Sequence, residues 1–422
     1  MTELVLDRRR ALGGFMAFGL FWGTWGAVLP AVQVSSGSTD GELGTALLMI
    51  GLGALLSMRV AGRLVDRLGV RVLPVAVAVF AVAGVLPGFA RSPVTLGAAL
   101  LLLGAASGAT DVAINAAGVH AEVRSKRPVM NLAHAWFSVC VVVASLGTAV
   151  LRAAGAAPWL VLGAVFVLIA VIAVFVLGPG AFGTRNESTQ ATTRGRREPS
   201  APRRGTRTRR VGTPLIVFGC LGALAYLVEN AWQSWGAVYM QSTLHASAGM
   251  SSTAPAVFAS AAAVGRFAGN ALARRCHPVW LLSAGALTAG AGTLVAATAR
   301  PPWIGLVGIA VAGLGTSVCA PTIISLAGAW AGLERRGAAV STVTTVAYLG
   351  FLVGPAGVGL ASSLTSLRTA LLGVALVAVL LAVLAPTARR ASAPEESATP
   401  IDGPAGAPNV SDTAAAAELR NR

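Results

Sequence analysis

Apolar runs separated by short polar turns recur along most of the chain, and each run is about twenty residues long, enough to cross the hydrocarbon core of a bilayer as a helix. Unbroken runs without alternating polar positions favour helices over the strands of a barrel. The pattern predicts twelve membrane helices, six of them at 11–33, 42–62, 73–90, 94–118, 129–151 and 158–178. The other six are expected at 214–239, 251–270, 279–299, 303–327, 338–361 and 368–386.

Two polar segments break this pattern. Residues 183–211 are rich in Arg, Pro, Ser and Thr, residues 387–422 are rich in Ala, Pro and Glu, and neither has an apolar period. Such compositions cannot bury enough apolar surface to become ordered. We therefore predict four segments, namely a six-helix half over 1–182, a disordered cytoplasmic linker over 183–211, a second six-helix half over 212–386 and a disordered cytoplasmic tail over 387–422.

The composition agrees with a membrane protein. Of 422 residues 55% are hydrophobic and 11% are charged, against roughly 25% charged in a soluble domain. The 32 basic residues outnumber 16 acidic ones and are all arginine except Lys126. They concentrate in alternate loops, which by the positive-inside rule places both termini in the cytoplasm. Because no basic face is interleaved with aromatic residues, we expect membrane lipid and no nucleic acid as a partner.

The chain shows no sign of enzyme chemistry. It has no clustered metal ligands, no nucleophile–base set and no nucleotide-binding loop, and its four cysteines are scattered singly. We expect no enzymatic activity, no metal and no cofactor. The expected partners of this monomer are a small-molecule solute and a proton or another ion, and its expected location is the cell (inner) membrane.

The loop after the second predicted helix carries the sharpest motif, GRLVDRLGVR at 62–71. It resembles the cytoplasmic signature of the major facilitator superfamily, in which Gly-x-Leu-(Gly/Ala/Val)-Asp-Arg-x-Gly precedes basic residues. The gate positions that this resemblance implies are Gly62, Asp66, Arg67, Gly69 and Arg71. The first glycine would permit close helix approach and the second a turn with positive φ. The carboxylate would accept bonds at a helix N-terminus, and the arginines would pair with carboxylates across the halves.

The second half carries a degenerate copy of this motif, GRFAGNALARR at 265–275. Arg274 stands where the acid would be, so we expect a weakened gate there. Arg266 is counted with the basic residues of this loop.

Three further stretches resemble the fucose-permease-like branch of the superfamily. Asp111 precedes Asn115 by one helical turn, Asn131-Leu132-Ala133 opens the fifth predicted helix, and Glu229 lies in the seventh. The resemblance covers about residues 10–386. It implies an all-α membrane protein with twelve helices in two pseudo-symmetric halves, working by alternating access around a site between them.

Polar and ionisable residues inside membrane helices are costly and mark functional candidates. Asp111 shares a helix face with Asn115, and Glu229 shares one with Gln233. The substrate- or proton-binding candidates are Asp111, Asn115, His134, Glu229, Trp232, Gln233, Trp22 and Trp25. For the ionisable residues the alternative is a structural hydrogen bond, and for the first-helix tryptophans it is packing or interfacial anchoring.

These features together predict a secondary active transporter of a small organic solute, sugar-like or similar, with proton coupling. Two alternatives stay open, namely a multidrug or amphiphile efflux transporter and a membrane sensor with the same fold and no turnover. The Gly-Pro motif that drug–proton antiporters carry on their fifth helix is missing from the corresponding run here.

Overall fold

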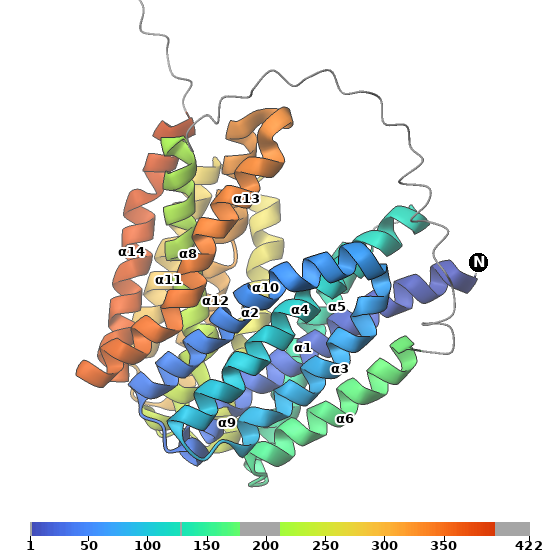
Figure 1. Cartoon of the computed structure of the whole chain (residues 1–422). Helices are drawn as coiled ribbons and strands as arrows, with labels where there is room; N and C mark the ends of the chain where they lie inside the picture. The colour runs from blue at the N-terminus through green and yellow to red at the C-terminus, as the bar shows by residue number, and fades with distance from the viewer. Residues whose placement is uncertain (1, 127–128, 178–211, 393–422) are drawn as a thin grey trace, which may run out of the picture. The chain divides into compact units, whose positions relative to one another are not determined.

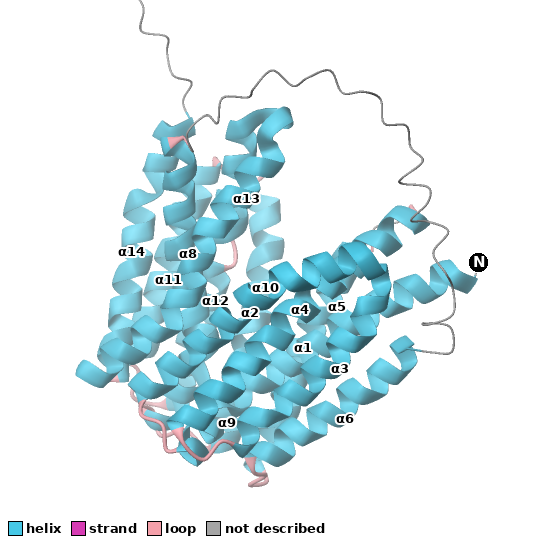
Figure 2. Cartoon of the chain, in the orientation of Figure 1, coloured by secondary structure: helices cyan, strands magenta, loops and turns pink. Residues whose placement is uncertain are grey.

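The protein, seen here in a computed structural model, is built from α-helices (Figures 1 and 2). The structure describes residues 2–126, 129–177 and 212–392, and it contains no strand in these ranges. Residues up to Ser392 belong to one unit. The linker expected at 183–211 and the tail beyond Ser392 lie outside the described residues.

Six long helices form the N-terminal half, one for each expected span. They are α1 (Thr2–Ser36), α2 (Asp40–Leu68), α3 (Val72–Val85), α4 (Pro93–Ser125), α5 (Met130–Ala153) and α6 (Pro158–Leu177). Short 3-10 turns, η1 (Gly69–Arg71) and η2 (Leu86–Phe89), flank α3.

The C-terminal half is less regular than the six expected spans. Its helices are α8 (Thr213–Ser242), α9 (Ala248–Ser252), α10 (Ala254–Leu272), α11 (Pro278–Thr298), α12 (Pro302–Thr316), α13 (Cys319–Leu364) and α14 (Leu367–Ser392). The eighth expected span is divided between α9 and α10, since Pro255 lacks an N–H at the start of α10. The last helix runs to Ser392, past the boundary expected at residue 386.

The structure differs most from the prediction at the tenth and eleventh expected spans. A break at residues 317–318 separates α12 from α13, and the helical backbone then continues through the loop expected between 327 and 338. That connection, AGAWAGLERRGA, contains no proline and is rich in the good helix formers Ala, Leu, Glu and Arg. By length and composition the membrane segments on its two sides are still distinct, Pro302–Ala331 and Ala339–Leu364.

Length and apolar composition make this an integral membrane protein. Among the described residues, nine segments are long and apolar enough to cross a bilayer, and one of them, Asp40–Phe89, holds both α2 and α3. Separating those two and adding α6 and α10 accounts for the twelve expected spans. Many large apolar side chains are exposed on the outer faces, such as Val94 at 81% and Phe267 at 79%, where they would meet lipid.

Turn residues explain where several helices begin. Thr39 Oγ1 accepts a bond from the Glu42 N–H (3.3 Å) while the Glu42 carboxylate accepts one from the Thr39 N–H (2.8 Å), which forms a capping box on α2. Ser92 caps α4 in the same way through the Thr95 N–H (3.2 Å).

Small residues let the helices pack at short range. A Cβ on Gly104 of α4 would collide with the Ile50 carbonyl of α2, and one on Gly23 of α1 with the Val141 carbonyl of α5. Such close backbone approach is typical of membrane helix interfaces, where packing replaces the hydrophobic effect.

The two halves meet at one end of the helices and separate toward the other. In Figure 1, α2 begins beside the end of α13 and runs away from it. We call the end with the connections 37–39, 243–247 and 365–366 the closed end. The opposite end, with 69–71 and 273–277, is the motif end.

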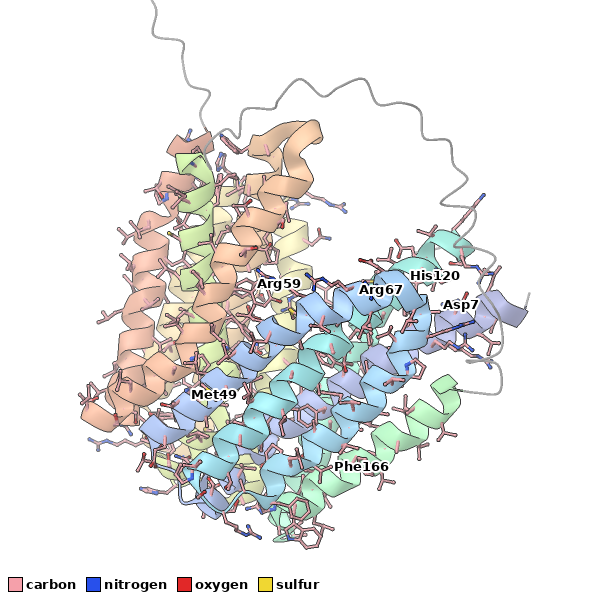
Figure 3. All side chains as sticks on the ribbon, in the orientation of Figure 1. Asp7, Met49, Arg59, Arg67, His120 and Phe166 are labelled. Atoms are coloured by element: carbon pink, nitrogen blue, oxygen red, sulfur yellow. The ribbon has the colours of Figure 1, made fainter. Side chains whose placement is uncertain are left out.

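A buried acid ties α1 to α4 at the motif end of the N-terminal half. Asp7, 8% exposed, lies 2.7 Å from Arg124 Nη1, 3.7 Å from Arg10 Nη1 and 3.8 Å from His120 Nε2. Figure 3 shows Asp7 and His120 close together on these two helices.

Candidate functional site

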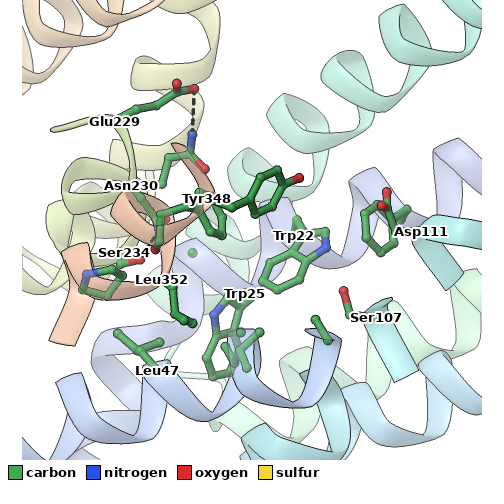
Figure 4. A pocket seen from close by; sticks show the side chains of 18 of the residues that line it. Trp22, Trp25, Leu47, Ser107, Asp111, Glu229, Asn230, Ser234, Tyr348 and Leu352 are labelled. Atoms are coloured by element: carbon green, nitrogen blue, oxygen red, sulfur yellow. Dashed lines mark hydrogen bonds between the residues drawn. The ribbon is translucent and has the colours of Figure 1, made fainter. Parts of the chain in front are cut away.

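A cavity of about 530 Å³ lies between the two halves. Its walls come from α1, α2, α4 and α5 of the first half and from α8, α10 and α13 of the second. Sites for small molecules typically measure about 300–1,000 Å³ and combine apolar walls with a few polar groups. Figure 4 shows this composition, with Trp22 and Trp25 between Asp111 and the polar residues of α8.

Aromatic rings form much of the wall. Trp22 and Trp25 both line the cavity, as do Phe137 and Tyr348. Trp22 packs edge-on against Phe18 (6.0 Å between centroids), so the tryptophans meet other rings as well as the cavity. Both tryptophans thus pack in the structure and line the cavity, and their contact with a ligand stays a prediction.

Asp111 is the acid of the N-terminal wall. Asn115, one turn further along α4, donates from Nδ2 to the Asp111 carbonyl (2.8 Å) and to Asp111 Oδ1 (3.1 Å). Asn115 itself does not line the cavity. No cation of the described chain lies within ion-pair distance of Asp111, so its carboxylate is held by an amide alone.

Glu229 is the acid of the C-terminal wall, and it has a different environment. Its Oε1 accepts a bond from Gln233 Nε2 (3.1 Å), marked by the dashed line in Figure 4, and lies 3.6 Å from Arg266 Nη2. Arg266 was counted with the basic residues of the following loop, although the helix expected at 251–270 contains it. The structure places Arg266 inside α10, where it lines the cavity.

Besides Asn115, two predicted candidates lie away from the cavity. Trp232 is 1% exposed and donates from Nε1 to Thr293 Oγ1 of α11 (2.9 Å). The helical period turns it about 100° away from its neighbour Gln233, which explains why the two do not share a wall. His134 is exposed outside the cavity lining, with its ring edge-on to Phe15 (4.8 Å).

Sequence reasoning missed several polar residues of the wall. Asn230 and Ser234 of α8 line the cavity, and Ser234 Oγ donates to Asn230 Oδ1 (3.3 Å). The Asn230 amide also donates to the Phe351 carbonyl of α13. Their i, i+4 spacing in an apolar helix was a readable signal. No comparable spacing of polar residues in the sequence pointed to Tyr348.

Bonds between the halves seal the closed end. Ser362 Oγ of α13 donates to Asp40, the first residue of α2, which also accepts a bond from Gln33 Nε2 of its own half (2.7 Å). Ser252 Oγ of α9 donates to the Ala27 carbonyl of α1 (2.8 Å). The same serine's carbonyl accepts a bond from Ser145 Oγ of α5 (3.0 Å).

Close backbone packing supports these bonds. A Cβ on Gly44 of α2 would lie 2.9 Å from Gly359 Cα and 3.2 Å from the Pro355 carbonyl of α13. No side chain larger than hydrogen fits there without movement of the helices.

The motif end has no comparable seal among the described residues. The side chains of Asp66 and Arg67 are exposed and make no hydrogen bond or ion pair to another described residue. Gly69 has the positive φ expected of it, +63°. Gly62 does not mediate close helix approach here, because a Cβ at that position would meet nothing within 4 Å. Arg71 follows in η1.

Comparison with known proteins places this geometry in a family. The family model of the Major Facilitator Superfamily matches residues 11–275 and 219–414. An uncharacterised transporter of this type from Yersinia pestis is 29% identical over 384 residues, which cover 89% of this chain and 93% of that protein. An uncharacterised transporter from Sinorhizobium fredii is 37% identical over 148 residues, 35% of this chain and 39% of the relative.

Solved structures share the fold at low sequence identity. A bacterial homologue of the human lysosomal transporter Spinster, inward-facing and occupied, has a TM-score of 0.73 at 16% identity, covering 90% of this chain and 96% of that one. A nucleoside transporter has a TM-score of 0.72 at 14% identity, with coverage of 91% and 99%. The E. coli fucose–proton symporter has a TM-score of 0.54 at 16% identity, with coverage of 91% and 99%.

Proposed function

Because the chain belongs to the major facilitator superfamily, we propose that it moves a small organic solute across the cell membrane by alternating access, with a proton as the coupling ion. It is a multi-pass membrane transporter of this superfamily and not an enzyme. In alternating access the halves rock about a central site, which opens to one side of the membrane at a time.

The observation that carries this proposal is the central cavity itself. Both halves supply its walls, and bonds such as Ser362 to Asp40 join the described residues of the two halves at the closed end. Alternating access by rocking requires a binding site shared between two halves that are in contact at one end.

The arginine-rich connections indicate which end of the cavity faces the cytoplasm. Arg67 and Arg71 lie at the motif end of the first half, and Arg274 and Arg275 lie at the motif end of the second. The positive-inside rule assigns this end to the cytoplasm. The helices α1 and α14 begin and end at this end respectively, which supports the proposal of cytoplasmic termini and of an inward-open conformation.

Asp111 is the proposed proton carrier. Protonation of this carboxylate breaks no ion pair, whereas protonation of Glu229 breaks the pair with Arg266. The cavity also gives Asp111 direct access to the solute-binding space. Asn115 holds the carboxylate in one position through both protonation states, because its amide bonds the backbone carbonyl as well as Oδ1.

The cavity suits a sugar-like solute in the manner of the fucose-permease-like branch. Ring faces of Trp22 and Tyr348 offer flat apolar contact, and Gln233, Asn230 and Ser234 offer hydrogen-bonding groups. Solved relatives with this fold include a D-xylose–proton symporter, with a TM-score of 0.67, and a nucleoside transporter.

Amphiphile efflux is the second candidate, and the wall favours it in one respect. Most lining side chains are apolar or aromatic, including Leu47, Ile50, Leu55, Met58 and Phe258. A broad apolar wall accepts flat amphiphilic molecules without strict hydrogen-bonding demands.

The test is uptake into proteoliposomes under an imposed pH gradient. Sugars, nucleosides, carboxylates and amphiphiles are first screened by thermal shift for stabilising compounds. Wild-type protein should concentrate a stabilising solute. Asp111→Asn keeps the acceptor for Asn115 but cannot release a proton, so accumulation should be lost while solute exchange remains.

Thr298→Ala, at an exposed hydroxyl outside the cavity that bonds carbonyls of its own helix, is the control and should accumulate solute normally. Continued accumulation by Asp111→Asn would remove Asp111 as the coupling residue. Binding without uptake or exchange by the wild-type protein would instead indicate a sensor.

A further inference from the structure

Arg266 occupies an unusual position for a cation. It lies six residues before the end of α10, on the face that lines the cavity, and its side chain is 52% exposed. Its guanidinium lies 3.6 Å from Glu229, which is inside the membrane span Pro214–Ser242. Guanidinium groups inside membrane segments are costly and persist where they meet a partner or a water-filled path.

The contacts of Arg266 leave most of its donors unused. Its one ion pair with a described residue is to Glu229 Oε1 at 3.6 Å, and it makes no hydrogen bond to any described side chain or carbonyl. Glu229 Oε1 is also the acceptor for Gln233. A guanidinium has five donors arranged to grip a carboxylate by two parallel bonds, and Glu229 does not engage it in this way.

We propose that Arg266 binds the anionic group of the solute, and that the transported compound is an organic acid with an apolar or aromatic body. This inference rests on the proposed function and specifies its substrate class. Glu229 is then the partner of Arg266 while the site is empty. The incoming carboxylate displaces it, and Glu229 keeps the bond from Gln233.

The surroundings of Arg266 leave room for such a group. The cavity-lining residues one and two turns before it on α10 are Ala262 and Ala259, which occupy little volume. Phe258 and Trp22 also line the cavity and offer apolar surface for the rest of the molecule. When the cavity closes and loses water, Arg266 needs a strong acceptor, because an unpaired buried guanidinium is strongly unfavourable.

Charge balance links the anion to the proton. The charged residues that line the cavity are Asp111, Glu229 and Arg266, a net charge of −1 with both acids ionised. A bound carboxylate lowers this to −2, and one proton on Asp111 restores it. The loaded and empty cavities then carry the same charge, so solute and proton cross together.

The test uses two pairs of compounds that differ only in charge, glucuronate with glucuronamide and phenylacetate with phenylacetamide. Purified full-length protein is titrated with each by calorimetry. Wild-type protein should prefer the acid of a pair by about tenfold or more, the size expected for a charge-assisted contact. Arg266→Gln should abolish this preference, and Arg266→Lys should keep part of it.

Glu229→Gln separates binding from structure. Removal of the competing carboxylate should raise the affinity for the acid. If the ion pair were purely structural, Glu229→Gln and Arg266→Gln would lower the affinity for the acid equally. Arg274→Gln removes the same charge from an exposed position outside the cavity. It should leave the affinities for the acid and the amide unchanged. Thermal midpoints of all variants check that each is folded.

Equal affinity for acid and amide, no binding of either acid, or a preference that survives Arg266→Gln would overturn the inference. A fall in acid affinity in Glu229→Gln would do so as well. If a neutral solute is still driven by the pH gradient, the proposed function stands without the anion site. Acids that bind but are never transported would instead contradict the proposed function.

Discussion

The two ends of the cavity differ in how the halves are joined. At the closed end, α2 begins against α13 with Asp40 bonded to Ser362 and Gly44 packed on Gly359. At the motif end the same helix finishes at Leu68, and Asp66 near that finish is exposed and bonded to no described residue.

This difference leads to the prediction that α2 carries two contacts with the second half, of which only the one at the closed end is made in this structure. A rocking motion that opens the closed end would break the Asp40 bond and bring Asp66 toward the second half. Each end then contributes free energy to one conformation only, so substitutions at the two ends should shift the equilibrium in opposite directions.

The largest effect is expected from Gly44→Val. Its side chain would press on the backbone of α13, and overpacking of this kind costs about 2–3 kcal/mol. The inward-open population should fall about thirtyfold or more, with a gain in labelling of cysteines placed in the cavity from the outer side. Gly97→Val, at a position where a Cβ meets nothing within 4 Å, should leave labelling unchanged; equal labelling of both variants would contradict the closed-end contact.

Asp40→Ala should act in the same direction and less strongly. It removes the acceptor of Ser362, the bond that joins the two halves, a loss of about 1–2 kcal/mol, and the ratio of inward-open to outward-open protein should fall by about tenfold. Ser363→Ala, at a neighbouring hydroxyl that bonds only the Leu360 carbonyl of its own helix, is the control. Accessibility from the outer side reports the shift, and no change in Asp40→Ala would mean that the bond does not hold the ends together.

Asp66→Asn should have a smaller effect of the opposite sign. Its carboxylate makes no contact here, so the inward-open state loses nothing, while the outward-open state loses a latch at an exposed site, about 0.5–1 kcal/mol. Cytoplasmic labelling of cavity cysteines should rise by about threefold and transport should slow. Unaltered transport kinetics and labelling would remove the latch.

Trp232→Phe should have the smallest effect on the equilibrium between the two conformations. The substitution removes the indole bond to Thr293, which joins α8 to α11 inside one half, and should lower stability by about 1 kcal/mol. A thermal melt measures that loss, and solute affinity should not change. A clear fall in affinity would place Trp232 in the binding site after all.

The pattern of apolar runs predicted where the helices lie, but it did not predict well where they break or continue. The prolines at 93, 158, 214, 278 and 302 lie at or beside helix starts, because proline fits the first turn without loss of a bond. The continuous backbone of α13 through 332–338 could not be anticipated, since a polar connection rich in helix formers is compatible with either a loop or a bend in a helix.

The two acids of the candidate site could be predicted from the sequence, whereas the residues around them could be predicted less well. Asp111 and Glu229 stood out because charge inside a membrane span is rare. Arg266 was missed because it was counted with the basic residues of the following loop, although the expected helix at 251–270 contains it. Trp232 was misassigned because membrane helices bury several faces at once, so periodicity alone does not say which face meets the cavity.

The most direct test of the central claim is a pair of distances between spin labels, one across each end. Labels at Arg91 and Arg300 span the closed end, and labels at Val123 and Arg275 span the motif end; all four positions are exposed. When Gly44→Val is introduced, or saturating solute is added to the wild-type protein, the account predicts that the 91–300 distance gains a longer population while the 123–275 distance gains a shorter one. Two distances that both stay fixed, or that lengthen together, would contradict alternating access in this protein.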